Sequence, residues 1–170
     1  MSLNLKNFSG LALLALSGCG FTPLYAGPQG EQASAALENV QIQTIAERPG
    51  QILRQTLQKD FYRNGQPVAA LYLLTVNYSI NQTGQGVQED SSTTRIRYDA
   101  TAQWTLSPIG QPGQILSEGN ATAIDASNIF DQQYFAANLE TQPIDQQLAT
   151  EISNQITLQL AIWFRAHPGS

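Results

Sequence analysis

Few side chains in this 170-residue sequence are of the types that do chemistry. There is one cysteine, Cys19, and one histidine, His167, so no cluster of His, Cys and carboxylate residues has metal-ligand spacing. No serine lies in a G-x-S-x-G setting, and Gly84-Gln85-Gly86 lacks the third glycine of a dinucleotide-binding loop. The acidic pair Glu89-Asp90 is typical of a solvated loop. The sequence therefore predicts a protein that is not an enzyme and that has no metal and no cofactor.

Two arginines have a spacing that suits phosphate binding. Arg95 and Arg97 are two residues apart in an alternating segment, so they project from the same face of a strand. Guanidinium groups bind phosphate oxygens bidentately. The alternative is that both are strand-edge charges paired with Asp99 or Glu118. Arg95 and Arg97 are therefore the candidate contacts with a phosphate-bearing ligand or a partner.

The cysteine follows a short apolar segment. Lys6 precedes the run FSGLALLAL at residues 8–16, which has roughly half the ~20 apolar residues of a membrane-spanning helix and so indicates a signal peptide. The order Leu16-Ser17-Gly18-Cys19 resembles the lipobox of bacterial lipoproteins, which implies lipidation of Cys19 and removal of residues 1–18. The alternative is a buried or reactive free thiol, since an exported chain with one cysteine has no internal disulfide partner. Gly20, where an Asp would mark inner-membrane retention, favours delivery to the outer membrane.

Removal of residues 1–18 would leave 170 − 18 = 152 residues, enough for one domain with a core. We expect a lipidated tether with little fixed structure over residues 19–36, one domain over 37–166, and a tail over 167–170. The mature chain loses Lys6, so it has 8 − 1 = 7 basic and 13 acidic residues, a net charge of −6, which argues against nucleic-acid binding. Amides and hydroxyls fill the polar positions instead. Such a surface suits burial against another polar wall.

The hydrophobic pattern predicts an α+β fold. Alternation indicates strands at residues 37–46, 70–80, 94–106 and 114–125, and apolar stripes indicate helices at residues 48–65 and 143–165. This order predicts a two-layer sandwich, a mostly antiparallel four-stranded sheet with two helices on one face. The other face would be rich in amides and hydroxyls. The polar segment 81–93 predicts that the first hairpin extends well beyond the core.

The strand phases predict which side chains form the core. Alternation over residues 94–106 turns Trp104 toward the helices, against Ile152, Ile156 and Leu160, and turns Arg95 and Arg97 away. Leu71 and Leu73 predict that the second strand is covered on both faces at its start. The last strand has a face of small residues that would sit under a helix or border a cavity: Ile115, Gly119, Ala121 and Ala123.

Several motifs in order are similar to one family. The segment Cys19-Gly20-Phe21-x-Pro23-Leu24-Tyr25 resembles the mature start of the lipopolysaccharide-assembly lipoprotein family LptE, particularly its alphaproteobacterial members. TTR at residues 93–95, WTL at residues 104–106 and the final LAIWFR at residues 160–165 are also similar to that family. Pro143 is a departure, because members tend to continue helically there.

The resemblance implies a non-catalytic plug inside the outer-membrane β-barrel LptD, which supports barrel assembly and helps lipopolysaccharide (LPS) reach the outer leaflet. The implied partners are LptD, LPS and the outer membrane, which would hold the chain on its periplasmic side through Cys19. Arg95 and Arg97 would then contact LPS or the barrel. The alternative is a free-standing periplasmic lipoprotein that binds an apolar ligand between helices and sheet, with Gly119, Ala121 and Ala123 lining the cavity.

Overall fold

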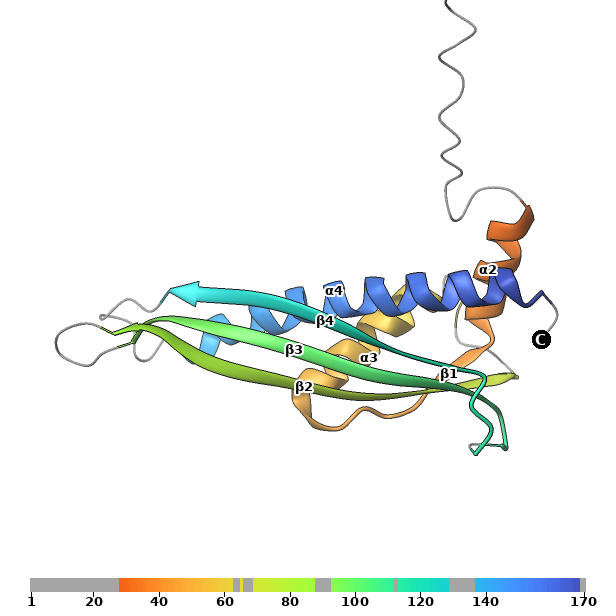
Figure 1. The fold of residues 1–170 in the computed structure, drawn as a ribbon, viewed down its shortest axis with the longest axis horizontal. Helices are drawn as coiled ribbons and strands as arrows, with labels where there is room; N and C mark the ends of the chain where they lie inside the picture. Colours follow the sequence, from red (N-terminus) through yellow and green to blue (C-terminus); the bar gives the residue numbers. More distant parts are fainter. Residues whose placement is uncertain are drawn as a thin grey trace, which may run out of the picture.

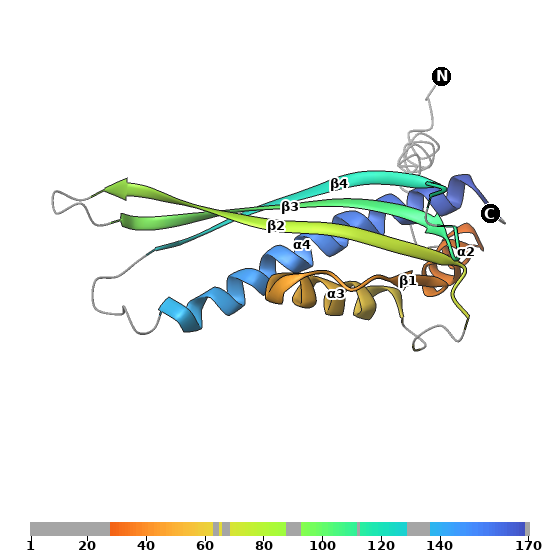
Figure 2. The same ribbon diagram turned by 90° about the horizontal axis from the view of Figure 1, so that it is seen from below.

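The computed structural model describes residues 28–62, 65, 69–87, 93–111, 113–128 and 137–168. Along the chain, the elements are α2 (Pro28–Glu38), β1 (Val40–Ile42), α3 (Glu47–Phe61), β2 (Tyr72–Val87), β3 (Thr93–Pro108), β4 (Ser117–Asn128) and α4 (Ala137–Ala166). The strands form one sheet in the order β1-β2-β3-β4, in which β1 is parallel to β2 and the other pairs are antiparallel. Helices α3 and α4 lie on one face of the sheet (Figures 1 and 2). The predicted α+β two-layer architecture is confirmed.

The N-terminal helix α2 was not predicted. We expected little fixed structure over residues 20–36, and this is wrong for Pro28–Ala36, which are helical. Ala33 and Leu37 are 1% and 3% exposed and belong to the core, so the packed domain begins before residue 37. The sequence signal was weak because only these two apolar residues mark the buried stripe. The first strand was predicted at residues 37–46, but α2 includes residues 37 and 38 and the strand β1 has only three residues.

Helix α3 follows its predicted stripe closely. Leu53, Leu57 and Phe61 are at most 1% exposed, and Ile52 packs beside them. The helix spans Glu47–Phe61, with Pro49 in the first turn, where its missing N–H has no helical partner to lose. It stops four residues before Gly65, the predicted stop, which has a positive φ of 101° that favours glycine.

Strands β2 and β3 are long for a protein of this size. Each has 16 residues, which corresponds to roughly 50 Å at about 3.3 Å per residue. Pairing continues from Tyr72↔Pro108 to Val87↔Thr93, and the far ends of both strands extend past the start of α4 (Figure 2). Residues 81–85 are exposed. The predicted extension of this hairpin beyond the core is therefore confirmed, as a paired ribbon.

The core follows the predicted strand phases with two exceptions. Tyr98, Ala100, Ala102, Trp104 and Leu106 of β3 are all buried, as are Ala121 and Ala123 of β4. Leu71 is 57% exposed, so the expected cover on both faces of β2 is wrong at this point. Ile115 precedes β4 and is 54% exposed, so it does not continue the small-residue face. Both residues lie outside the regular strands, where alternation no longer fixes direction.

Helix α4 starts six residues before the predicted boundary. It covers Ala137–Ala166 and contains Pro143 in its interior, so the predicted start at Pro143 is wrong. Residues 137–142 read ANLETQ, which includes Ala, Leu, Glu and Gln, all good helix formers without an apolar period. The buried stripe matches the prediction and consists of Ile144, Leu148, Ile152, Ile156, Leu160 and Phe164.

Candidate interaction surface

The sheet face turned away from the helices is the candidate functional surface, called here the polar sheet face. In the described chain the helices contact each other and the opposite face (Figure 2). Six rows on this face span β2, β3 and β4: Thr75–Thr105–Glu118, Asn77–Gln103–Asn120, Ser79–Thr101–Thr122, Asn81–Asp99–Ile124, Thr83–Arg97–Ala126 and Gln85–Arg95–Asn128. Twelve of these 18 side chains are amides or hydroxyls and only four are charged. The face is therefore polar but nearly neutral.

The two candidate arginines differ in their surroundings. The Arg97 guanidinium donates from Nε to both Asp99 carboxylate oxygens, at 2.9 and 3.1 Å, and its Nη2 lies 2.8 Å from Oδ1. Arg95 is exposed, and no described carboxylate is within ion-pair distance of it. The alternative of pairing with Asp99 is therefore realised for Arg97. The two guanidinium groups do not form a free clamp, and Arg95 is the available cation.

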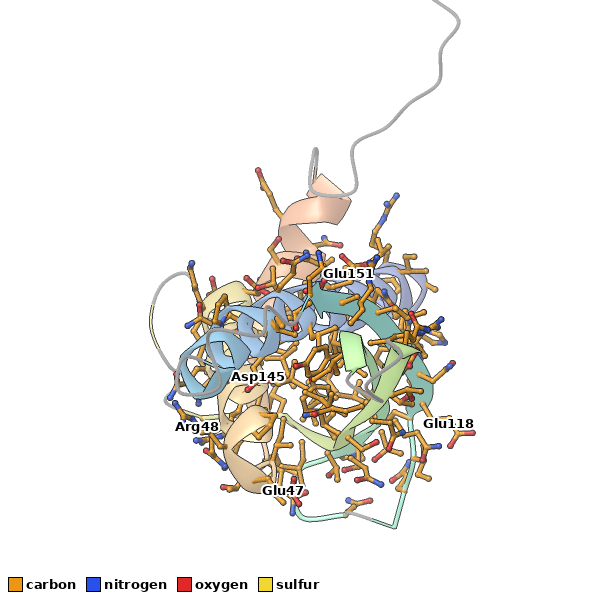
Figure 3. The ribbon with its side chains drawn as sticks, turned by 90° about the vertical axis from the view of Figure 1, so that its left-hand side faces the viewer. Glu47, Arg48, Glu118, Asp145 and Glu151 are labelled. Atoms are coloured by element: carbon orange, nitrogen blue, oxygen red, sulfur yellow. The ribbon has the colours of Figure 1, made fainter. Side chains whose placement is uncertain are left out.

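Glu118 is not a partner of either arginine. It pairs with Thr105, whereas Arg97 pairs with Ala126, eight residues farther along β4. Eight residues of strand correspond to roughly 26 Å. Figure 3 shows Glu118 on the side of the molecule opposite Arg48 and Asp145. The arginines therefore lie near the free end of the hairpin, and Glu118 lies near the other end of the sheet.

Two glutamines of α4 cover the open edge of β4. Gln155 donates from its amide to the Thr122 carbonyl (2.9 Å) and accepts from the Thr122 N–H (3.1 Å). Gln159 donates to the Asn120 carbonyl (3.0 Å) and accepts from the Trp104 indole N–H (3.0 Å). The two amide side chains form the hydrogen bonds that the backbone of a further strand would form with this edge. They satisfy an edge that would otherwise be a template for pairing with another chain.

Replacing Gln155 with leucine should weaken this edge. The two hydrogen bonds to Thr122 would be lost, which we expect to lower the free energy of unfolding by about 1–2 kcal/mol. The exposed edge should also promote self-association, measurable by light scattering during storage. Gln146→Leu is the matched control, because Gln146 is exposed on the same helix. Equal behaviour of the two variants would contradict an edge-covering role for Gln155.

The small-residue face of β4 is closely packed. A Cβ atom on Gly119 would lie 2.7 Å from both the Gln159 Oε1 and the Trp104 Cζ2 atoms. Ala121 is 1% exposed. Gly119 and Ala121 therefore make room for Trp104 and α4, and the predicted ligand cavity beneath them is not formed. Ala123 lines a shallow groove with Ile124, Gln147 and Glu151 beside the β4 edge.

A polar contact joins α3 to α4. Ser153, which is fully buried, donates its hydroxyl to Asp60 Oδ2 at 2.5 Å. A small pocket beside this pair is lined by Ser34, Leu37, Lys59, Asp60, Phe61, Asn154 and Thr157. The Ser–Asp pair has no histidine between its members, so it lacks the base that would activate a serine nucleophile. The contact therefore holds the two helices together.

Tyr78 and Asp145 both have raised pKa values, and the charge of Asp145 acts on Tyr78. Burial raises the pKa of Asp145, and the nearby Arg48 opposes that rise. Figure 3 shows Arg48 and Asp145 on the same side of the molecule. Burial, with the Asp145 charge added, raises the pKa of Tyr78 to about 12. The Tyr78 hydroxyl is buried without a hydrogen bond to any described residue.

Tyr78→Phe should leave stability at pH 7 unchanged or slightly higher, because no described hydrogen bond is lost. The folded-state pKa lies above the ordinary value of 10, so the native protein loses stability as pH rises from 10 through about 12. Tyr78→Phe should lose less over that window in urea titrations. Tyr62→Phe is the comparison at pH 7, since the Tyr62 hydroxyl donates to the Val40 carbonyl (2.7 Å) and its loss should cost about 1 kcal/mol there. Burial also raises the pKa of Tyr62, so this comparison does not extend to high pH.

Several predicted features lie outside the described residues. Cys19, the lipobox and the segment 20–27 are among them, so the structure leaves lipidation as a prediction. Among the described residues, no group of three or more His, Cys, Asp or Glu side chains could hold a metal ion. Within that same part of the chain, no helix combines the length and hydropathy that crossing a membrane requires.

Solved structures with the same fold are lipoproteins. A candidate lipoprotein of Caulobacter crescentus CB15 aligns with 81% of this chain and 98% of its own, at 25% identity and a TM-score of 0.62. Rare lipoprotein B of Shewanella oneidensis aligns with 72% of this chain and 93% of its own, at 10% identity and a TM-score of 0.54. A minor lipoprotein of Acinetobacter baumannii aligns over 72% and 88%, at 14% identity and a TM-score of 0.52. No family model and no curated protein matches the sequence. The chain therefore has the fold of a group of bacterial lipoproteins.

Proposed function

We propose that this chain is a non-catalytic, lipid-anchored lipoprotein of the LptE type. It sits in the lumen of an LptD-type outer-membrane barrel, helps that barrel assemble, and supports the insertion of LPS into the outer leaflet. Cys19 holds it to the periplasmic side of the outer membrane. The motifs at residues 19–25, 93–95, 104–106 and 160–165 support this proposal, as does a fold shared with solved lipoproteins.

The polar sheet face is the observation that carries the proposal. Most of its 18 side chains are amides and hydroxyls, presented on a sheet roughly 50 Å long. The lumen of a large transmembrane barrel is itself polar. Neutral polar side chains can exchange water for hydrogen bonds with such a wall, without the cost of desolvating many charges. Antiparallel sheets often have one solvated face, so the support for a partner comes from the small number of charges on this face.

The packing of β4 argues against the alternative, an apolar ligand held between helices and sheet. That alternative needs space beneath Gly119, Ala121 and Ala123. Trp104 and Gln159 fill the space at Gly119, and Ala123 borders only an open groove at the β4 edge, which Gln147 and Glu151 also line. The described pocket between α2, α3 and α4 is small and lined in part by Lys59 and Asp60, which does not suit an acyl chain.

Arg95 is the proposed ligand contact of this surface. It is exposed at the free end of the hairpin and is flanked across the strands by the neutral Gln85 and Asn128. Its guanidinium can bind a lipid A phosphate of LPS or a carboxylate of the barrel wall. Arg97 shares its charge with Asp99 and contributes less.

The double change Arg95→Ala/Arg97→Ala should keep the fold, because an exposed pair such as Arg97–Asp99 contributes about 0–1 kcal/mol. We expect weaker LPS binding than in the native protein, and native binding that falls as salt is added. Arg95→Ala alone should account for most of the loss, with Arg97→Ala as its matched control. Equal losses from the two single changes would contradict the assignment to Arg95. Normal LPS binding with lost barrel association would move the contact to the barrel wall.

The proposed function is tested by purifying the tagged, lipidated protein from detergent-solubilised outer membranes. We expect a stoichiometric β-barrel partner, identified by mass spectrometry. Cross-linkable residues placed at Gln103 and Ser79 of the polar sheet face should capture that partner, whereas one at the fully buried Ile156 of α4 should not. No barrel partner, together with a co-purifying lipid, would favour the free-standing alternative.

A further inference from the structure

The sheet becomes apolar at the end where β2 begins and β3 ends. The backbone N–H of Ile109 donates to the Leu71 carbonyl (2.9 Å), so these residues are neighbours just outside the two strands. Their side chains are 57% (Leu71) and 41% (Ile109) exposed, and Ile115 in the following turn is 54% exposed. We call Leu71, Ile109 and Ile115 the end patch. All three are exposed branched aliphatic side chains next to the strand ends at this end of the sheet.

The two segments that contain this patch are uncharged. Residues 64–88 and 100–117 have no Asp, Glu, Lys, Arg or His, and the exposed Glu118 follows the second segment directly. Burying the three patch side chains alone would therefore desolvate no ion of either segment. The chain has 21 Asp, Glu, Lys and Arg residues elsewhere, so the neutrality of these two segments is a local feature.

The patch lies at the end of the molecule where α2 packs. The Asn39 carbonyl, directly after α2, accepts from the N–H groups of Leu71 (2.9 Å) and Tyr72 (3.3 Å). Tyr72 packs on Phe164 near the end of α4, with ring centroids 5.2 Å apart, and α2 and the C-terminus lie at this same end (Figure 1). Eight residues lie between Cys19 and Pro28, so the anchor lies within about 30 Å of the start of α2.

We infer that the end patch inserts into the surface of the lipid bilayer that holds the anchor. This inference rests on the proposed lipidation of Cys19. Because this short tether keeps the patch close to the membrane, even a weak apolar contact with the lipid forms in a large fraction of the molecules. Leucine and isoleucine side chains gain about 0.8 kcal/mol per buried CH₂ group in the acyl region. A lipid surface suits the patch better than a specific protein pocket, because its few side chains are all branched aliphatics without a polar group that would orient a partner.

The test uses the lipidated protein in phosphatidylcholine vesicles that contain a quencher lipid, without barrel or LPS. Ile109→Cys is labelled with an environment-sensitive fluorophore, since the thioether at Cys19 leaves no other reactive thiol. Ile124→Cys, 63% exposed on β4 away from this end, is labelled as the matched control. We expect strong quenching at position 109, no quenching at position 124, and no effect of added salt. Leu71→Gln should reduce the inserted-to-free ratio at position 109 about tenfold.

Each other outcome overturns the inference. Equal quenching at positions 109 and 124 would indicate contact without orientation. If the fluorophore at position 109 reports an apolar environment but is not quenched by the lipid, a second copy of the chain covers the patch instead. Absence of both effects in vesicle-bound protein would leave the plug proposal intact and exclude bilayer insertion. Protein that does not float with the vesicles would instead refute lipidation of Cys19, and the inference with it.

Discussion

Trp104→Ala should lower the free energy of unfolding by about 3–5 kcal/mol, a large share of the roughly 5–15 kcal/mol that stabilises a domain. The indole is 3% exposed and fills the space above Gly119. Its N–H donates to Gln159, which also bonds the β4 edge at Asn120. Removing the ring therefore leaves a cavity and takes away one partner of a bridging amide. Chemical denaturation followed by circular dichroism measures the change.

Trp163→Ala is the control of the same residue type. Trp163 is partly exposed and stacks on His167, with ring centroids 4.6 Å apart, so its removal should cost much less. Gly119→Ala gives a second check, because its Cβ would overlap the Trp104 ring and should cost about 1–3 kcal/mol. In the Trp104→Ala background that penalty should shrink, which a double-mutant cycle detects. Additive effects would mean that the two residues do not share this space.

Burial in the interiors of the strands was predictable because it depends only on which sheet face a side chain points to. Each residue of β3 from Ile96 to Leu106 faces either the helices or the polar side, and period-two alternation reports that choice directly. The same rule placed Arg95 and Arg97 on the uncovered face. It failed at Leu71 and Ile115, because both lie beyond the regular pairing, where hydrophobicity no longer implies burial.

The helix boundaries and the edge contacts were harder to predict. Helix α2 buries only a narrow stripe that includes Ala33 and Leu37, and alanine carries little hydrophobic signal. Gln155 and Gln159 have the four-residue spacing of one helix side, yet glutamine at such positions is usually solvated. Their role depends on which strand edge α4 follows, and that is a property of the assembled fold. Likewise, only the side-chain geometry shows that Arg97 is bonded to Asp99 while Arg95 is available.

Cys19→Ala should abolish membrane attachment almost completely. The motif Leu16-Ser17-Gly18-Cys19 implies that this sulfur carries the lipid, and no other cysteine in the chain can replace it. One acyl chain anchors a protein only marginally, whereas two or three chains, at about 0.8 kcal/mol per buried CH₂, hold it stably. The variant should therefore incorporate no labelled fatty acid and should either appear in the soluble periplasmic fraction or keep its uncleaved signal segment. Its thermal unfolding should match that of the native protein, since the residue precedes the packed domain.

Gly20→Asp is the matched control for this change. It alters the neighbouring residue and keeps the thiol, so it should still incorporate labelled fatty acid and remain in membranes. If Gly20 directs delivery to the outer membrane, the aspartate should shift the protein toward the inner membrane in a density gradient. Cys19→Ala should then fail to capture the barrel partner, and Gly20→Asp should capture less of it, because both remove the protein from the barrel mouth by different routes. Labelled fatty acid in the Cys19→Ala protein would show that the lipid is attached elsewhere. The end patch of Leu71, Ile109 and Ile115 would then no longer be held near the membrane by the short segment that follows Cys19.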